Sequence, residues 1–376
     1  MIGCGGNKQS ASDLIKVDVT ASYPKKELIL QDFADVEYIP LETTNDFLCQ
    51  GRVMAIGKKY MVIMNNRPDG NIFIFDRNGK GVKTFNHKGL GGEEYLYVHD
   101  IILDEDKGEL FINDNSKKKI LIYDLFGNFK RNIMHKENIR YHNILNFSRG
   151  CLILWNSAFE FNNNAAEASS FFIISKQDGS LIKEIEVPIK QRESTVLISH
   201  DETTQTTFSI SASYSSIIPY QDQFILFEPS SDTIYKYSLD YNLTPFLVRT
   251  PSIHSMNPEV FLFPGTLSNS YYFMKTSKKE YNFTSGQGLF ETELVYDKKA
   301  MTIFKSVVLN DDYTNNNPVS MTENIVNQEI ASWQKIEAFS LIEALKKGQL
   351  KGKLKEVASK LKEDDNPVIM LIKQKK

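Results

Sequence analysis

Two segments of the chain contain the same pattern, and this repeat limits the possible fold more than any other feature. Ile72–Gly79 reads Ile-Phe-Ile-Phe-Asp-Arg-Asn-Gly, and Ile120–Gly127 reads Ile-Leu-Ile-Tyr-Asp-Leu-Phe-Gly. Their aspartates, Asp76 and Asp124, are 48 residues apart. Each copy joins a strand of β-branched and aromatic residues to a turn that ends in glycine. A period in the forties, carried by short strands and turns, is typical of a β-propeller blade.

Weaker copies of the pattern follow, and they predict the number of blades. Their anchors at Ser175, Ser238 and Asp297 come after gaps of 51, 63 and 59 residues, so the later blades contain insertions. Strand-like segments at 36–41 and 366–372 remain for a sixth blade, in which the two ends of the chain pair and remove free sheet edges. We therefore predict an all-β, six-bladed propeller over residues 31–376, closed by residues 367–373. The alternative is a β-sandwich with accidental internal similarity.

One region departs from the β pattern. Between about 329 and 362, apolar residues recur at steps of three and four, which is helical spacing. We predict a small helical insertion here that packs on the propeller as a cap, and the alternative is a helix that binds a partner.

The amino terminus suggests export. Residues 1–6 read Met-Ile-Gly-Cys-Gly-Gly, which matches the end of a bacterial lipoprotein signal, with Cys4 as the lipid-bearing residue. We predict that residues 1–30 form a lipoprotein-type terminus and a flexible tether. The protein would then lie in the periplasm or at the cell surface, anchored by lipid to the outer membrane. The alternative is a cysteine that lies near the start by chance.

Composition and motifs exclude several classes of function. The net charge of −3 argues against a nucleic-acid surface. The six histidines form no zinc-ligand pattern, and the chain contains neither a phosphate-binding loop nor a Gly-x-Ser-x-Gly nucleophile motif. We therefore predict no metal site, no cofactor and no identifiable catalytic residue, and we expect a monomer.

The second repeat also resembles a known class of sequence. Residues 109–129 are similar to an NHL-type propeller repeat, and residues 89–95 look like its glycine-rich loop between blades. From about residue 30 to 376, the chain resembles the six-bladed β-propeller lipoproteins of Gram-negative gut anaerobes, on segments 38–44 and 364–370. The resemblance implies a propeller outside the cytoplasm but no reaction. It departs at Gly92-Glu93, where a Pro-Gly pair is usual.

Candidate ligand-binding residues come from the loops expected at one face of the ring, because function on rigid scaffolds concentrates in such loops. Acidic or amide residues recur at one equivalent position in blades one, two and four, where they would hold a cation or a hydroxyl-rich ligand. We expect a ligand on this face rather than on the face of tight turns that carries Gly57, Gly79, Gly108 and Gly127. The alternative is that these residues only cap strand ends and turns. The candidates are Asn66, Arg67, Glu94, His99, Asp114, Trp155 and Glu228.

Two classes of function remain open. The first is a membrane-anchored binding or scaffold protein whose partner is an unidentified small molecule, glycan, peptide or protein. The second is a propeller enzyme, a lyase or hydrolase acting on glycans or peptides. Such enzymes gather their catalytic residues from separate blades and leave no linear motif.

Overall fold

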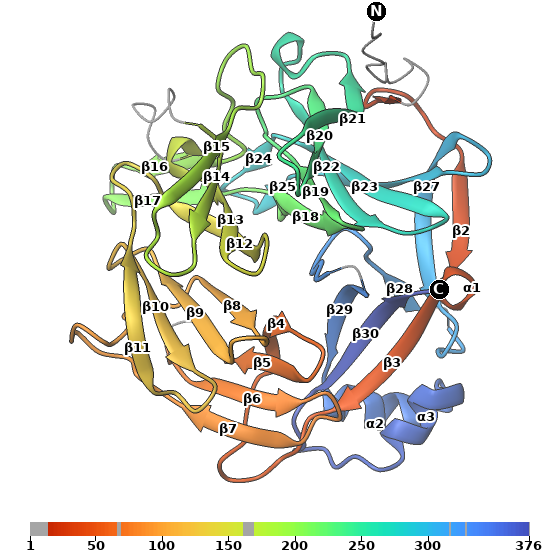
Figure 1. Cartoon of the computed structure of the whole chain (residues 1–376). Coiled ribbons are helices and arrows are strands. Elements are labelled where there is room, and N and C mark those ends of the chain that lie inside the picture. Colours follow the sequence, from red (N-terminus) through yellow and green to blue (C-terminus); the bar gives the residue numbers. More distant parts are fainter. Residues whose placement is uncertain (1–13, 66–68, 161–168, 316, 328, 376) are drawn as a thin grey trace, which may run out of the picture.

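Six blades surround a central axis in the computed structural model, which describes residues 14–65, 69–160, 169–315, 317–327 and 329–375 (Figure 1). The predicted six-bladed propeller is therefore confirmed. Within a blade, the first strand lies next to the axis and later strands follow toward the rim.

The first three blades are four-stranded antiparallel sheets in which consecutive strands pair. Blade 1 consists of β4 (Arg52–Ile56), β5 (Tyr60–Met64), β6 (Ile72–Asp76) and β7 (Gly81–Phe85). Blade 2 consists of β8 (Asp100–Asp104), β9 (Glu109–Asp114), β10 (Lys119–Asp124) and β11 (Phe129–Met134). Blade 3 consists of β12 (Tyr141–Asn146), β13 (Cys151–Asn156), β14 (Phe171–Ser175) and β15 (Leu181–Ile185).

The other three blades each include a strand from the amino-terminal part of the chain. Blade 4 consists of β18 (Ile217–Tyr220), β19 (Gln223–Leu226), β20 (Thr233–Ser238), β21 (Leu243–Thr250) and β1 (Ile15–Asp18). Blade 5 consists of β22 (Val260–Leu267), β23 (Tyr271–Lys278), β26 (Glu291–Asp297), β27 (Thr302–Asn310), β28 (Asn317–Val319) and β2 (Lys25–Ile29). Blade 6 consists of β29 (Ile330–Ile336), β30 (Val368–Gln374) and β3 (Ala34–Pro40).

Shorter elements connect or cover the blades. They are the hairpins β16 (Leu197–Asp201) with β17 (Thr206–Ile210) and β24 (Tyr281–Asn282) with β25 (Gln287–Gly288), the helices α1 (Leu30–Phe33), α2 (Ala338–Lys346) and α3 (Gly352–Ala358), and the 3₁₀ turns Ala158–Glu160 and Ile253–Ser255. Within the described residues, no helix has the length and apolar character needed to cross a membrane.

The repeated turns have the same chemistry in blades 1 and 2. The Asp76 carboxylate accepts hydrogen bonds from the backbone N–H groups of Asn78 and Lys80, at 2.8 and 3.0 Å. Asp124 accepts the equivalent bonds from residues 126 and 128. Gly79 has a φ of 84°, a conformation that side-chain-bearing residues rarely adopt. The repeat in the sequence therefore corresponds to a turn in which an aspartate side chain caps backbone N–H groups and a glycine adopts a positive φ.

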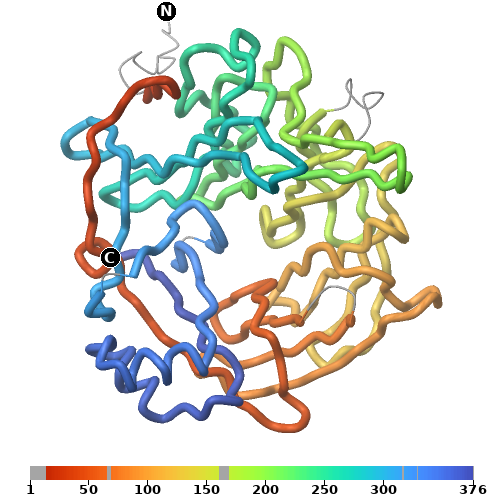
Figure 2. The backbone as a smooth tube through the Cα atoms, turned by 180° about the vertical axis from the view of Figure 1, so that it is seen from behind, coloured from red at the N-terminus to blue at the C-terminus, as the bar shows by residue number. Residues whose placement is uncertain are grey.

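The first strands form what we call the N-terminal belt, residues 15–40. β1 runs parallel to β21, β2 runs parallel to β27, and β3 pairs antiparallel with β30, so the belt follows the rim of blades 4, 5 and 6 (Figure 2). The prediction of a flexible tether over residues 1–30 is wrong for residues 15–18 and 25–29. Val17 and Leu28 are buried in the cores of the blades that they join, so isolated apolar residues suffice to fix short strands in a polar stretch.

The predicted helical region begins later than its spacing indicated. Residues 330–336 form β29, and helices α2 and α3 occupy only 338–346 and 352–358. Pairing with β30 overrides the helical spacing, because it buries Ile330 and Ala331 and satisfies the backbone in a sheet. The helices then cover the rim of blade 6 (Figure 1).

A network of charged side chains joins blades 2 and 3. The Lys176 ammonium lies 2.7 Å from the Asp104 carboxylate, and both side chains are buried. Beside them, Arg131 binds Glu109 through two nitrogens, at 2.8 and 3.0 Å. These bonds from Arg131, with Lys130 close by, lower the pKa of Glu109 to about 2. Arg131 also donates to the backbone carbonyl of Lys176 at 2.9 Å. One ion pair and this hydrogen bond thus join the two blades in addition to apolar contacts.

Candidate functional site

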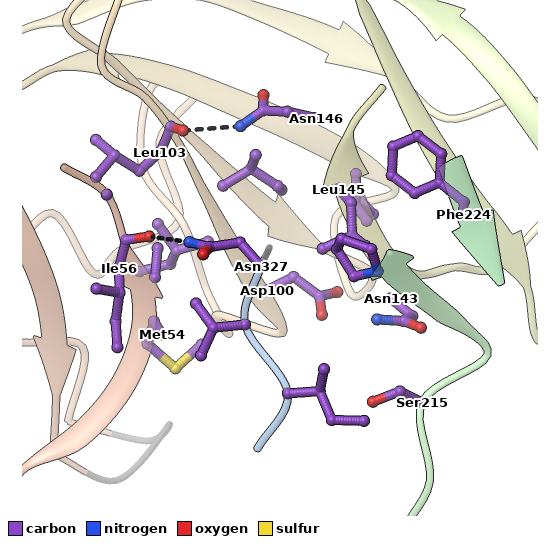
Figure 3. A pocket seen from close by; sticks show the side chains of 18 of the residues that line it. Met54, Ile56, Asp100, Leu103, Asn143, Leu145, Asn146, Ser215, Phe224 and Asn327 are labelled. Carbon is purple, nitrogen blue, oxygen red and sulfur yellow. Dashed lines mark hydrogen bonds between the residues drawn. The ribbon is translucent and has the colours of Figure 1, made fainter. Parts of the chain in front are cut away.

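A cavity of about 1160 Å³ occupies the axis of the propeller. The inner strands β4, β8 and β12 line it together with the β18–β19 turn and the segments 213–215 and 322–327. Apolar side chains such as Met54, Leu145 and Phe224 alternate along the wall with amides and carboxylates (Figure 3). Because these residues come from five blades, only the closed ring assembles the cavity.

Two asparagines, one in β12 and one in the segment before β29, reach the inner strand of the next blade at the turn end of the cavity. The Asn146 side-chain amide donates to the carbonyl of Leu103 at 2.9 Å, and that of Asn327 donates to the carbonyl of Ile56 at 3.3 Å (Figure 3). An inner strand is a sheet edge, so side chains from the next blade supply partners that no further strand can offer. These amides thus fix the spacing of the blades around the axis.

Three polar side chains surround another part of the cavity. Asp100 opens β8, and one of its carboxylate oxygens accepts a hydrogen bond from the Asn113 amide at 3.0 Å. Asn143 has a φ of 46°. The oxygen of its side-chain amide accepts a hydrogen bond from the backbone N–H of Ile217 at 2.7 Å. Ser215 extends from the segment before β18 (Figure 3). The described residues contain no partner for the second Asp100 oxygen, the Asn143 amide nitrogen or the Ser215 hydroxyl.

The turn face also contributes charged side chains to the cavity. Lys58, Asp106, Arg149 and Asp222 all line the cavity from turns between first and second strands. These turns belong to the strands nearest the axis, so even short hairpins place charged side chains at the mouth of the channel.

Of the candidates predicted from the sequence, His99 lines the cavity. Its ring packs against Tyr97, with 4.8 Å between ring centroids, and its Nδ1 lies 3.3 Å from the backbone nitrogen of Asn115. Glu94 instead folds over its own loop, where its carboxylate accepts from the backbone N–H of Gly91 at 2.7 Å.

Asp114 is fully buried and holds the chain between blades in place. It accepts hydrogen bonds from the backbone N–H groups of Leu96 and Tyr97, at 2.6 and 3.2 Å, and from those of residues 116 and 117. This is the capping role that the sequence left open as the alternative. Asn156 has a related role in blade 3, where it accepts from the backbone N–H of Arg140 at 3.1 Å.

Trp155 and Glu228 lie in the interior between blades 3 and 4, near Tyr214. The ring centroids of Trp155 and Tyr214 are 5.8 Å apart. Glu228 is 1% exposed and forms an ion pair with Arg192 at 3.1 Å. Neither residue lines the axial cavity. The Tyr214 hydroxyl donates to Glu160 at 3.0 Å, and burial, followed by the nearby Glu160 carboxylate, raises the Tyr214 pKa well above its ordinary value.

The remaining candidates, Asn66, Arg67 and Cys4, lie outside the described residues. Among the residues that are described, no group of three or more His, Cys, Asp or Glu side chains could hold a metal ion.

Sequence reasoning did not identify Asp100, Asn143, Ser215 or the two bridging asparagines. The repeat is strongest in the outer strands and their turns, whereas inner strands differ from blade to blade. Each of these residues lies in or beside the innermost strand of a blade. A search of the polar residues in those strands would therefore have found them.

Comparison with known proteins places the chain in a family. A model described as "Domain of unknown function (DUF4934)" matches residues 14–373. The chain belongs to the DUF4934 family. That match covers the belt and all six blades of this DUF4934 protein. A search of curated proteins finds no match.

Comparison with a solved structure supports the fold of this DUF4934 protein. A Bacteroides fragilis protein, described provisionally as exported, is similar at a TM-score of 0.61 and 14% identity, over 97% of this chain and 99% of its own. A DUF4221 member from Bacteroides vulgatus has a TM-score of 0.43 and 10% identity, over 91% and 98%. A virginiamycin B lyase from Staphylococcus aureus has a TM-score of 0.36 and 13% identity, over 72% and 87%. The last two similarities are too weak to carry a conclusion.

Proposed function

We propose that this DUF4934 protein is an extracytoplasmic binding protein that holds its ligand in the axial cavity. The observation that supports this proposal is the cavity, whose volume of about 1160 Å³ matches or exceeds that of common small-molecule sites. Apolar and polar groups contribute about equally to its wall, so the cavity can bury the apolar parts of an organic ligand and orient its polar groups. A buried ion pair and bridging amides fix blades to one another, so the cavity is preformed.

A screen with defined probes tests the cavity as the binding site. We expect members of a pool of tripeptides or neutral trisaccharides to raise the melting temperature, because a ligand that binds only the folded state stabilises it. Ser215→Trp places a bulky ring in the cavity and should abolish the shift. Leu90→Trp is the matched control, because Leu90 is 85% exposed and does not line the cavity. Probes that stabilise both variants equally, or no stabilising probe in either pool, would refute the proposal.

The proposed location includes a lipid anchor at Cys4. It is supported by the Ile2-Gly3-Cys4 sequence and by the description of the Bacteroides fragilis protein as exported. In cells fed an alkyne-labelled fatty acid, we expect the natural precursor to carry the label and to sediment with outer membranes. Cys4→Ala should lose both properties, whereas Cys49→Ala should keep them. Unchanged partitioning of Cys4→Ala would show that this cysteine carries no anchor.

A further inference from the structure

We propose that the ligand of the cavity is a short peptide, or a peptide-like amine, whose free amino group binds Asp100. This inference rests on the proposed function and names the chemical class that the site would select.

The Asp100 carboxylate is held in a fixed orientation by the Asn113 amide. The Asn113 amide donates to it at 3.0 Å and to the Tyr141 carbonyl at 2.9 Å, so Asn113 is itself anchored to the next blade. No lysine or arginine among the described residues forms an ion pair with Asp100. A carboxylate in a cavity loses hydration when a ligand fills the space, and a cationic group on that ligand compensates for the loss.

Two hydrogen-bond donors lie in the same part of the cavity as Asp100 (Figure 3). The Asn143 carbonyl oxygen is occupied by the Ile217 N–H, which leaves the amide nitrogen to donate. Ser215 offers a hydroxyl in the same part of the cavity (Figure 3). One fixed acceptor beside two donors matches an ammonium group that is followed by a carbonyl, which is the amino end of a peptide.

The surrounding wall suits an apolar side chain. Met54, Ile101, Leu145 and Ile325 line the cavity together with the three polar groups. An apolar wall with a few oriented polar groups selects by burying the side chain and by leaving mismatched polar groups unpaired. A neutral sugar would satisfy the donors but would leave the Asp100 charge without a counter-ion.

The test compares free and acetylated peptides on the full chain. The probes are a pool of tripeptides with an apolar first residue, the same pool after N-acetylation, and maltotriose, each titrated by calorimetry. We expect acetylation to weaken binding at least tenfold. Affinity for the free peptides should also fall as the pH rises above about 8, because the α-amino group then loses its charge.

Variants assign the effect to the carboxylate. Asp100→Asn should weaken binding of free peptides at least tenfold and leave any residual binding of acetylated peptides unchanged. Asp46→Asn is the matched control, because Asp46 is exposed and does not line the cavity, and it should change affinity less than twofold. Equal affinity for free and acetylated peptides, or no effect of Asp100→Asn in a folded protein, overturns the proposal.

The two proposals fail in different ways. Binding of maltotriose alone, abolished by Ser215→Trp, would refute the amine and preserve the cavity as a binding site. Binding of peptides that Ser215→Trp does not affect would refute both.

Discussion

A chain that lacks residues 367–376 is expected not to fold into a stable ring. β30 is the middle strand of blade 6 and pairs with β29 on one side and β3 on the other. All five residues from Val368 to Ile372 are at most 1% exposed. Burial of each such side chain contributes about 1.5–3 kcal/mol. The sum is comparable to the 5–15 kcal/mol that holds a typical domain together, so we expect the cooperative melting transition to disappear.

Complementation gives this prediction a matched control. A synthetic peptide of residues 367–376, added to the truncated chain, should restore a cooperative transition in circular dichroism, and a scrambled peptide should not. Equal melting temperatures for the truncated and full-length proteins would contradict the role assigned to β30.

The second large effect is expected at the buried ion pair between blades 2 and 3. Asp104→Ala leaves the Lys176 ammonium, whose side chain is 3% exposed, without its partner at 2.7 Å. Loss of one member of a buried pair costs about 3–5 kcal/mol, because the remaining charge stays desolvated. We expect this loss in the free energy of unfolding measured by urea titration.

A double variant separates the charge effect from packing. Asp104→Leu combined with Lys176→Met replaces both charges by apolar groups and should recover most of the loss. As a surface comparison, Glu343→Ala removes an exposed pair between α2 and Lys347, at 2.8 Å, and should change the free energy of unfolding much less than Asp104→Ala does. A cost for Asp104→Ala no larger than that of Glu343→Ala would show that Lys176 reaches water.

The parts of the fold that follow local rules were predictable from the sequence. Asp76 with Gly79 and Asp124 with Gly127 specify one turn, and their fixed separation specifies a blade. By contrast, β29 has helical spacing and becomes a strand only because β30 lies beside it. The pairing of β3 with the carboxyl-terminal strand was predicted, but β1 and β2 were missed, since they are short and their parallel partners lie far along the chain.

The site was less predictable than the fold, for a related reason. Asp114 and Glu228 occupy equivalent places and are acidic, but Asp114 caps backbone N–H groups and Glu228 pairs with Arg192 in the interior. Asp100 belongs to no repeated motif, and its proposed role depends on Asn143 and Ser215, which other blades contribute to the cavity. Spacing along a chain indicates which residues share a blade position, whereas convergence on the axis depends on the closed ring.

The N-terminal belt has a consequence for how the protein is made. Ile15 pairs with Leu247, Lys25 with Lys305 and Ala34 with Gln374, so the partners are 232, 280 and 340 residues apart. The first forty residues therefore leave the ribosome long before their partner strands have been synthesised. Contacts between such distant segments form slowly, and the ring cannot close until the last strand has emerged. A nascent chain of this design remains open during synthesis, which is the state in which a polypeptide can still be threaded through a narrow translocation channel.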